Sequence, residues 1–275
     1  MTQRSTKCVF VRAWAVAAWC TAGAVCAAHA GQACEEKAAD AQSVVSGMAL
    51  AASTSKALDA SGAAVVLLAR AGQDLSKYGL TYSHFGFAYR ETRGAVPAWR
   101  VLHKLNHCGT ALSALYRQGL GEFFLDRPFR YEAAFVALSP DLQARLLPLL
   151  QDNARVSVLN EPRYSMVAYA WAQTYQQSNQ WALETISVAA EPAVTDRKQA
   201  QAWMRLKGYE PTTLMLGALT RLGARATAAN VAFDDHPSDK RFSDRIETVT
   251  VDSVFAWVQR SGLGFAPVTV HGDPR

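Results

Sequence analysis

The chain has 275 residues, of which 50% are hydrophobic and 19% are charged. This length corresponds to roughly one large domain or two small ones, at about 100–200 residues per domain. The hydrophobic share suffices for a buried core, so wholesale disorder is excluded. With 17 glycines and 10 prolines the composition also excludes a collagen-like or low-complexity chain, and the formal net charge is +5.

Residues 1–30 have the pattern of a secretory signal peptide. Three basic residues precede an uncharged stretch over 13–28, and the segment ends in Ala28-His29-Ala30. A basic start, a short apolar middle and small residues before the cut predict cleavage before Gly31; a retained membrane anchor is the alternative. Cleavage lowers the formal charge from +5 to +2. We therefore expect a periplasmic or secreted protein without a nucleic-acid partner, and without a transmembrane segment once the leader is removed.

Two cysteines, Cys34 and Cys108, follow the leader. In an oxidising compartment this even number predicts one disulfide, which ties the N-terminal segment to the domain. The alternative is that Cys108 is a catalytic thiolate, since it stands before a segment that could open a helix. No Cys-x-x-Cys spacing occurs, so we expect no metal site and no cofactor.

The spacing of apolar residues predicts an α+β fold, with a small antiparallel sheet and flanking helices in a single domain over 31–275. In the first half we expect a helix over 31–61, strands over 63–70, 80–90 and 96–105, extended pieces over 123–125 and 131–138, and a helix over 139–150 that Ser139 caps. In the second half we expect an irregular segment over 163–177, helices over 178–190, 196–207, 211–222 and 252–260, and a strand over 245–251.

His84 is the first candidate for chemistry. It lies in Ser83-His84-Phe85-Gly86-Phe87, where aromatic residues alternate and Gly86 permits close approach of a neighbouring backbone. Such a histidine could serve as a base presented from a sheet. The alternative is an ordinary histidine at a strand edge.

The second candidate is the polar start of the helix over 178–190. Ser178, Asn179, Gln180 and Trp181 stand where the first backbone N–H groups of a helix are unpaired and the helix dipole is positive. That position favours a nucleophile or an anion on a substrate. Capping of the helix by Ser178 or Asn179 is the alternative.

Five segments resemble a secreted bacterial family known as domain of unknown function 2145. They are Gly72–Leu80, Tyr82–His84, Leu105–Thr110, Gly119–Asp126 and Ser178–Glu184. The order of a strand that bears Ser83-His84, a second strand, a helix and then a polar helix start is also distantly similar to circularly permuted NlpC-like members of the papain-like superfamily. That resemblance implies a papain-like fold with His84 as the base and Ser178 at the place of the nucleophilic cysteine.

The serine changes what the resemblance implies. A thiol with a free pKa of about 8.5 can ionise near neutral pH, whereas a serine hydroxyl needs a general base and a third, orienting group. His103, on the next strand, is a candidate for that group, as is an Asn or Glu. We expect Ser83, Asn179, Gln180 and Trp181 to line the same cleft.

Three functions follow from these patterns. The first is a catalytically silent binding or assembly factor that uses the degenerate cleft, with cell-wall peptide, lipid or another periplasmic protein as its partner. The alternative is a hydrolase or acyltransferase on wall-peptide amides or lipid esters, with His84 as base and Ser178 as nucleophile. A structural protein that docks a partner through aromatic side chains is the third.

Overall fold

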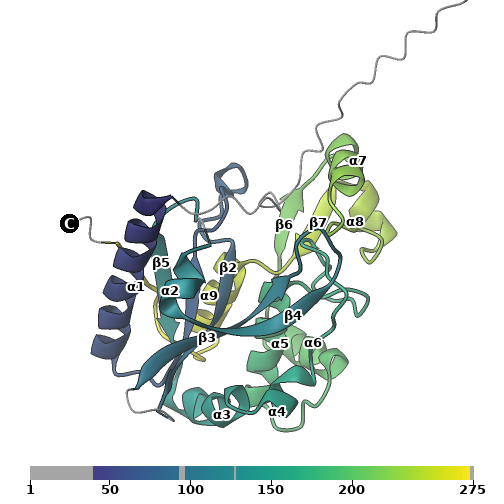
Figure 1. Cartoon of the computed structure of the whole chain (residues 1–275). Helices are drawn as coiled ribbons and strands as arrows, with labels where there is room; N and C mark the ends of the chain where they lie inside the picture. The colour runs from purple at the N-terminus through teal and green to yellow at the C-terminus, as the bar shows by residue number, and fades with distance from the viewer. Residues whose placement is uncertain (1–39, 93–96, 127, 273–275) are drawn as a thin grey trace, which may run out of the picture.

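A six-stranded antiparallel sheet forms the centre of the computed structural model, which describes residues 40–92, 97–126 and 128–272. Its strands lie in the order β4-β3-β2-β1-β5-β8, of which Figure 1 labels β2, β3, β4 and β5. They are β1 (Val65–Arg70), β2 (His84–Glu91), β3 (Ala98–Asn106), β4 (Ser113–Gly119), β5 (Glu132–Ala137) and β8 (Val268–His271). β1 and β2 are interior strands of this sheet, and the residues over 65–70 and 84–89 are all buried, so both faces of these strands are covered.

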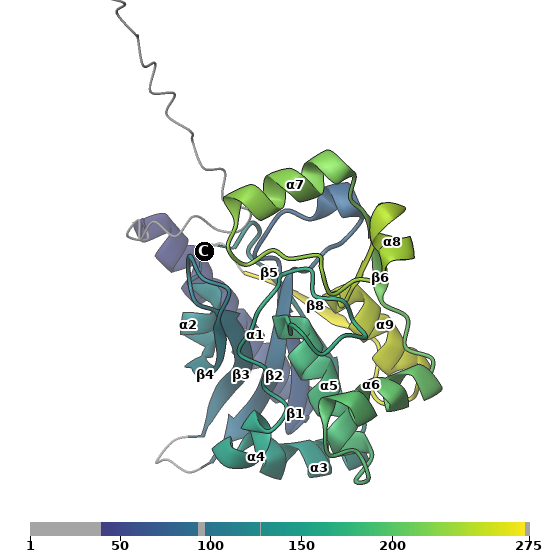
Figure 2. The ribbon, with the colours of Figure 1, turned by 90° about the vertical axis from the view of Figure 1, so that its right-hand side faces the viewer.

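Helices cover both faces of this sheet, as Figure 2 shows with the sheet between them. One face carries α1 (Ala41–Ser61) and the short α2 (Leu120–Phe124). The other carries α3 (Pro140–Leu150), α5 (Ser178–Ala190), α6 (Arg197–Leu206) and α9 (Val251–Arg260), with α4 (Asn153–Ser157) following α3. The core is therefore divided by the sheet into two apolar layers.

A smaller unit packs at one end of the molecule (Figure 1). It contains a two-stranded sheet of β6 (Thr212–Met215) and β7 (Arg245–Thr248), together with α7 (Ala218–Thr227) and α8 (Ser238–Phe242). Leu214, Phe233 and Ile246 belong to its own apolar cluster. A 3-10 turn, η1 (Ser76–Tyr78), lies in the loop before β2, and Tyr78 packs against this cluster.

The alternation of side chains along β2 decides which face each residue serves. Phe85 and Phe87 belong to the layer under α5, whereas Ala88 belongs to the layer under α1 and α2. Successive side chains of a strand point to opposite faces, so His84 and Gly86 share the face of Ala88. His84 is thereby directed away from α5.

The structure confirms the α+β class and the antiparallel sheet with flanking helices. Strands are present within or beside the expected ranges 63–70, 80–90, 96–105, 131–138 and 245–251, and helices within or beside 31–61, 139–150, 178–190, 196–207 and 252–260. Ser139 is the residue before α3, with Pro140 as the first helical residue. Pro140 has the fixed φ and missing N–H that suit a helix start.

Three expectations about elements are wrong. Residues 123–125 are not extended, because Leu120, Phe123 and Phe124 form one buried helical face of α2. Residues 211–222 are not one helix, because Thr212–Met215 pair with β7 and a new helix starts only after Gly217. The residue before α5 is Gln177, so neither Ser178 nor Asn179 caps that helix.

Several predictions for the N-terminal part lie outside the described residues. They are the signal peptide over 1–30, the cleavage before Gly31 and the cysteine Cys34. Cys108 lies in the exposed turn between β3 and β4, and its pairing with Cys34 stays a prediction. Across residues 40–92, 97–126 and 128–272, none of the helices has both the length and the apolar character needed to cross a bilayer.

Gly86 provides the first test of the fold. A Cβ at this position would lie 2.7 Å from the Cβ of His103 and 2.8 Å from the carbonyl oxygen of Leu102. We expect Gly86→Ala to lower the free energy of unfolding by about 1–3 kcal/mol, since neighbouring strands cannot separate cheaply. Urea unfolding followed by circular dichroism measures the change.

Gly223→Ala is the matched control. Apart from its chain neighbours and the backbone of its own helix, nothing in the described structure lies within 4 Å of a Cβ built at Gly223, which is inside α7. Alanine there should leave stability unchanged or raise it by up to about 1 kcal/mol. Equal effects of the two substitutions would contradict the close approach at Gly86.

Candidate functional site

His84 and His103 form a buried pair on the α2 side of the sheet. The Nε2 atom of His84 lies 2.7 Å from the Nδ1 atom of His103. One ring must donate and the other accept, so the bond fixes a relation between the two tautomers. Phe123 of α2 contacts both rings, with centroids 6.1 Å from His84 and 5.3 Å from His103. The structure thus brings together two of the three expected catalytic residues.

Gly86 makes this pair possible. It lies beside His103 on the neighbouring strand and has no side chain, so the two backbones can come close enough for His103 to reach His84. The Ser83-His84-Phe85-Gly86-Phe87 pattern is therefore explained by contact between two strands.

Arg70 adds a buried positive charge to the pair. It is the partner of His84 in the β1–β2 register. Its guanidinium donates to the carbonyl oxygen of Phe123, forms an ion pair with Asp126 and lies 4.9 Å from the centre of the Phe123 ring. Burial lowers the pKa of Arg70, and the charge of Asp126 opposes that shift.

Both imidazoles are held in the neutral form. Burial lowers the pKa of His84 well below its ordinary value, and His103 and Arg70 lower it further. Burial and then Arg70 lower the pKa of His103 to about 3. Desolvation disfavours the charged form of each imidazole, and the nearby positive charge disfavours it further. Together these effects account for the lowered pKa of both histidines.

One nitrogen atom of this cluster, Nε of Arg70, has no hydrogen-bond partner among the described residues. It is buried, so it bears the cost of an unmade hydrogen bond. A hydrogen bond with the side chain of Gln118 raises the pKa of His103 and so opposes part of the effect of burial. Within the described ranges, no three His, Cys, Asp or Glu side chains gather closely enough to hold a metal ion.

Ser178 does not join the histidine pair. It is buried in the first turn of α5, on the opposite face of the sheet, where it hydrogen-bonds with Tyr164. Burial raises the pKa of Tyr164, and the bond with Ser178 opposes that shift. Among the described residues no hydrogen bond joins Ser178 to His84. The three expected catalytic residues are therefore not assembled into one triad in this structure.

The expected binding residues make contacts that hold the fold. Asn179 accepts from the backbone N–H of Phe85 at 3.2 Å and donates to the carbonyl oxygen of Ser83 at 3.4 Å. Its amide thus fastens the start of α5 to the backbone on either side of His84. The hydroxyl of Ser83 accepts from the backbone N–H groups of Gly72 and Gln73 and so orders the loop after β1.

Gln180 and Trp181 are also internal. Gln180 donates to the carbonyl oxygens of Tyr169 and Ala170, each at 3.4 Å. Trp181 is fully buried and packs edge to face on Phe87 with ring centroids 5.8 Å apart. None of the four expected binding residues is exposed.

A second buried polar group lies on the α5 side of the sheet, around Lys104. The Nζ atom of Lys104 donates to Asn160 at 3.1 Å, to Gln176 at 2.7 Å and to the carbonyl oxygen of Glu161. Three acceptors match the three N–H bonds of an ammonium group. Burial and then the charge of Arg197 lower the pKa of Lys104 to about 7, while the charges of Glu184 and Glu161 oppose that shift.

Glu184 of α5 links this group to α6. It accepts from Gln176, from Arg197 at 2.8 Å and from Gln201 at 2.8 Å. Arg197 also donates to the carbonyl oxygens of Gln173 and Tyr175. The network therefore fixes the irregular segment before α5 between two helices.

Sequence reasoning missed Arg70, Lys104, Glu184 and Arg197. Arg70 is a charged residue at the end of the otherwise apolar β1, which is a signal for a buried and partnered charge. Lys104 lies in β3 with the polar residues Arg100 and His103, so the sequence gives no such signal for its burial. Glu184 lies in α5, where its sequence neighbours Leu183 and Thr185 are also buried. No comparable signal in the sequence pairs it with Arg197.

The comparisons with known proteins give one match. Residues 57–258 match the model of a family described as "Uncharacterized protein conserved in bacteria (DUF2145)". No curated protein and no solved structure matches.

The histidine pair predicts a pH dependence of stability. Below about pH 6.5 the unfolded chain binds a proton at His103, whereas the folded protein does so only near pH 3. Stability should therefore fall as the pH is lowered through this range, by up to about 1.4 kcal/mol per pH unit for each buried histidine. Urea unfolding at several pH values measures the slope, which should be smaller in His103→Leu. The exposed His107→Leu is the control, and a slope equal in all three proteins would contradict the prediction.

The Glu184–Arg197 pair predicts a large effect of a small change. Glu184→Gln leaves the Arg197 guanidinium buried without its counter-charge, and we expect a loss of about 3–5 kcal/mol in the free energy of unfolding. The double variant with Arg197→Met should recover much of the loss. Asp141→Asn, which breaks an exposed pair with Arg145, should cost less than about 1 kcal/mol. Comparable losses for the two single variants, measured by urea unfolding, would argue against a special role of the buried pair.

Proposed function

Since the chain belongs to the uncharacterised bacterial family DUF2145, whose model covers residues 57–258, we propose that it is a binding or assembly factor that does not catalyse hydrolysis. We further propose that it is exported to the periplasm and descends from papain-like proteins of the permuted NlpC type. Its partner is then a cell-wall peptide, a lipid or another periplasmic protein.

The separation of His84 from Ser178 carries the proposal. A serine nucleophile needs its base within hydrogen-bond reach, at about 2.6–3.2 Å between heavy atoms. His84 instead bonds to His103 on the α2 side, while Ser178 bonds to Tyr164 on the α5 side. A neutral imidazole could accept a proton, but the sheet lies between this ring and the hydroxyl.

The position of α5 supports the papain-like part of the proposal. In the family pattern a polar helix begins beside the strand that bears the histidine. Here Asn179 bonds to the backbone at Ser83 and Phe85, which flank His84. The helix start and the strand are adjacent, whereas the side chains that chemistry would need diverge.

Turnover assays test the absence of catalysis. We expect purified protein to hydrolyse a p-nitrophenyl ester and peptidoglycan fragments no faster than Ser178→Ala does, because the hydroxyl has no base. A fluorophosphonate probe should leave Ser178 unlabelled, as observed by mass spectrometry of the intact chain. Turnover that disappears in Ser178→Ala, with an unchanged circular dichroism spectrum, would establish the hydrolase instead.

A further inference from the structure

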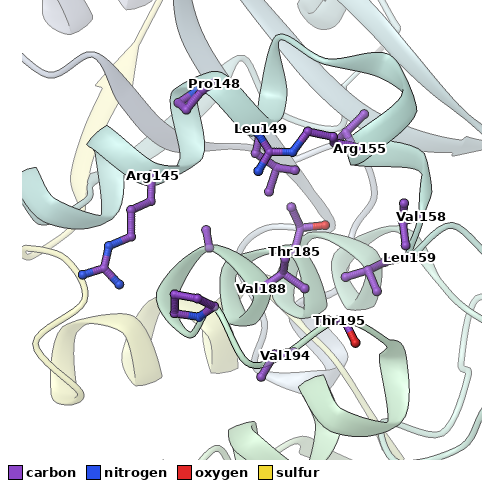
Figure 3. Close-up of a pocket in the computed structure, with 13 residues that line it drawn as sticks. Arg145, Pro148, Leu149, Arg155, Val158, Leu159, Thr185, Val188, Val194 and Thr195 are labelled. Atoms are coloured by element: carbon purple, nitrogen blue, oxygen red, sulfur yellow. The ribbon is translucent and has the colours of Figure 1, made fainter.

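A groove of about 520 Å³ lies between α3, α4, α5 and the segment that precedes α6 (Figure 3). Its size is within the range of small-molecule sites, which is about 300–1,000 Å³. None of the expected site residues lines it. It is therefore separate from the histidine pair and from the start of α5.

The floor of the groove is apolar. Leu149, Val156 and Leu159 present buried side chains to it, and Val188 and Ala189 contribute from α5. The hydroxyl of Thr185, which also lines the groove, donates to the carbonyl oxygen of Trp181 at 2.8 Å. With its proton used in this way, Thr185 adds little polarity to the floor. This surface favours a hydrocarbon chain.

Both charged side chains that line the groove are positive. Arg145 and Arg155 line it, and no acidic side chain is among its described lining residues. Arg145 is engaged by Asp141 at 2.6 Å and by the carbonyl oxygen of Ala190 at 3.0 Å. The side chain of Arg155 forms no hydrogen bond or ion pair with the residues that the structure describes, and it extends from α4 over the groove. A guanidinium with unused donors is suited to bind a carboxylate.

We propose that this groove binds an amphipathic carboxylate, with the acyl chain on the apolar floor and the carboxylate on Arg155. The inference rests on the proposed function, since it names the ligand class that such a binding factor takes. The charge of the rim and the apolar character of the floor together select this class over a neutral lipid or a polar peptide.

Titration calorimetry with sodium decanoate, below its micellar concentration, tests the proposal on the folded full-length protein. We expect saturable binding that Arg155→Ala weakens about tenfold or more, because it loses a charge-assisted hydrogen bond. Decanol, which lacks the charge, should bind equally to the wild type and to Arg155→Ala. The matched control is Arg225→Ala on the exposed surface of α7, which should leave decanoate binding unchanged.

A second variant guards against misfolding. Val158 is 68% exposed at the rim, so Val158→Asp adds a carboxylate without disturbing the core. It should abolish decanoate binding while the thermal unfolding midpoint stays unchanged. The proposal for this groove would be overturned by the absence of saturable binding to the wild type. It would also be overturned by binding that neither Arg155→Ala nor Val158→Asp reduces. Such a result is distinct from failure of the proposed function, which only Ser178-dependent turnover or labelling would show.

Discussion

The alternation of side chains along β2, between two helical layers, is the constraint on which the rest of the structure depends. Phe85 and Phe87 fill the layer under α5, and this commits His84 to the opposite layer, where Arg70 and Phe123 surround it. A shift of one residue in the register would exchange the two sets. The amide of Asn179 opposes such a shift, because it bonds to the strand backbone itself.

Charge burial is arranged differently on the two sides of the sheet. Under α2, a single guanidinium is balanced by a carboxylate at the surface, and the neighbouring imidazoles stay uncharged. Under α5, Lys104 and Arg197 share a buried environment with Glu184, and nearly every donor there meets an acceptor. Networks of the second kind hold elements in one relative position at the expense of stability, since desolvation offsets much of the attraction. The irregular segment before α5 depends on that arrangement.

Much of the fold could be predicted from the sequence, and the candidate site could not. Periodicity gave the strands around His84 and the helix that starts at Ser178, because both have strong apolar patterns. It failed at residues 211–222, where backbone pairing with a distant strand outweighs helix propensity. Periodicity also could not show which face of the sheet α5 covers, because the residues on both faces of β2 are buried. The pairing of His84 with His103 could have been predicted, since both residues were expected on adjacent strands. The position of this pair away from Ser178 could not.

The double cover of the sheet has a consequence for where recognition can occur. Because neither face of the central strands meets solvent, these strands offer no surface on which a ligand could bind. What stays open to a small molecule is the seam where one helix runs past another, as between α3 and α5. Variation in the side chains along such a seam would alter what the protein holds while leaving its framework untouched.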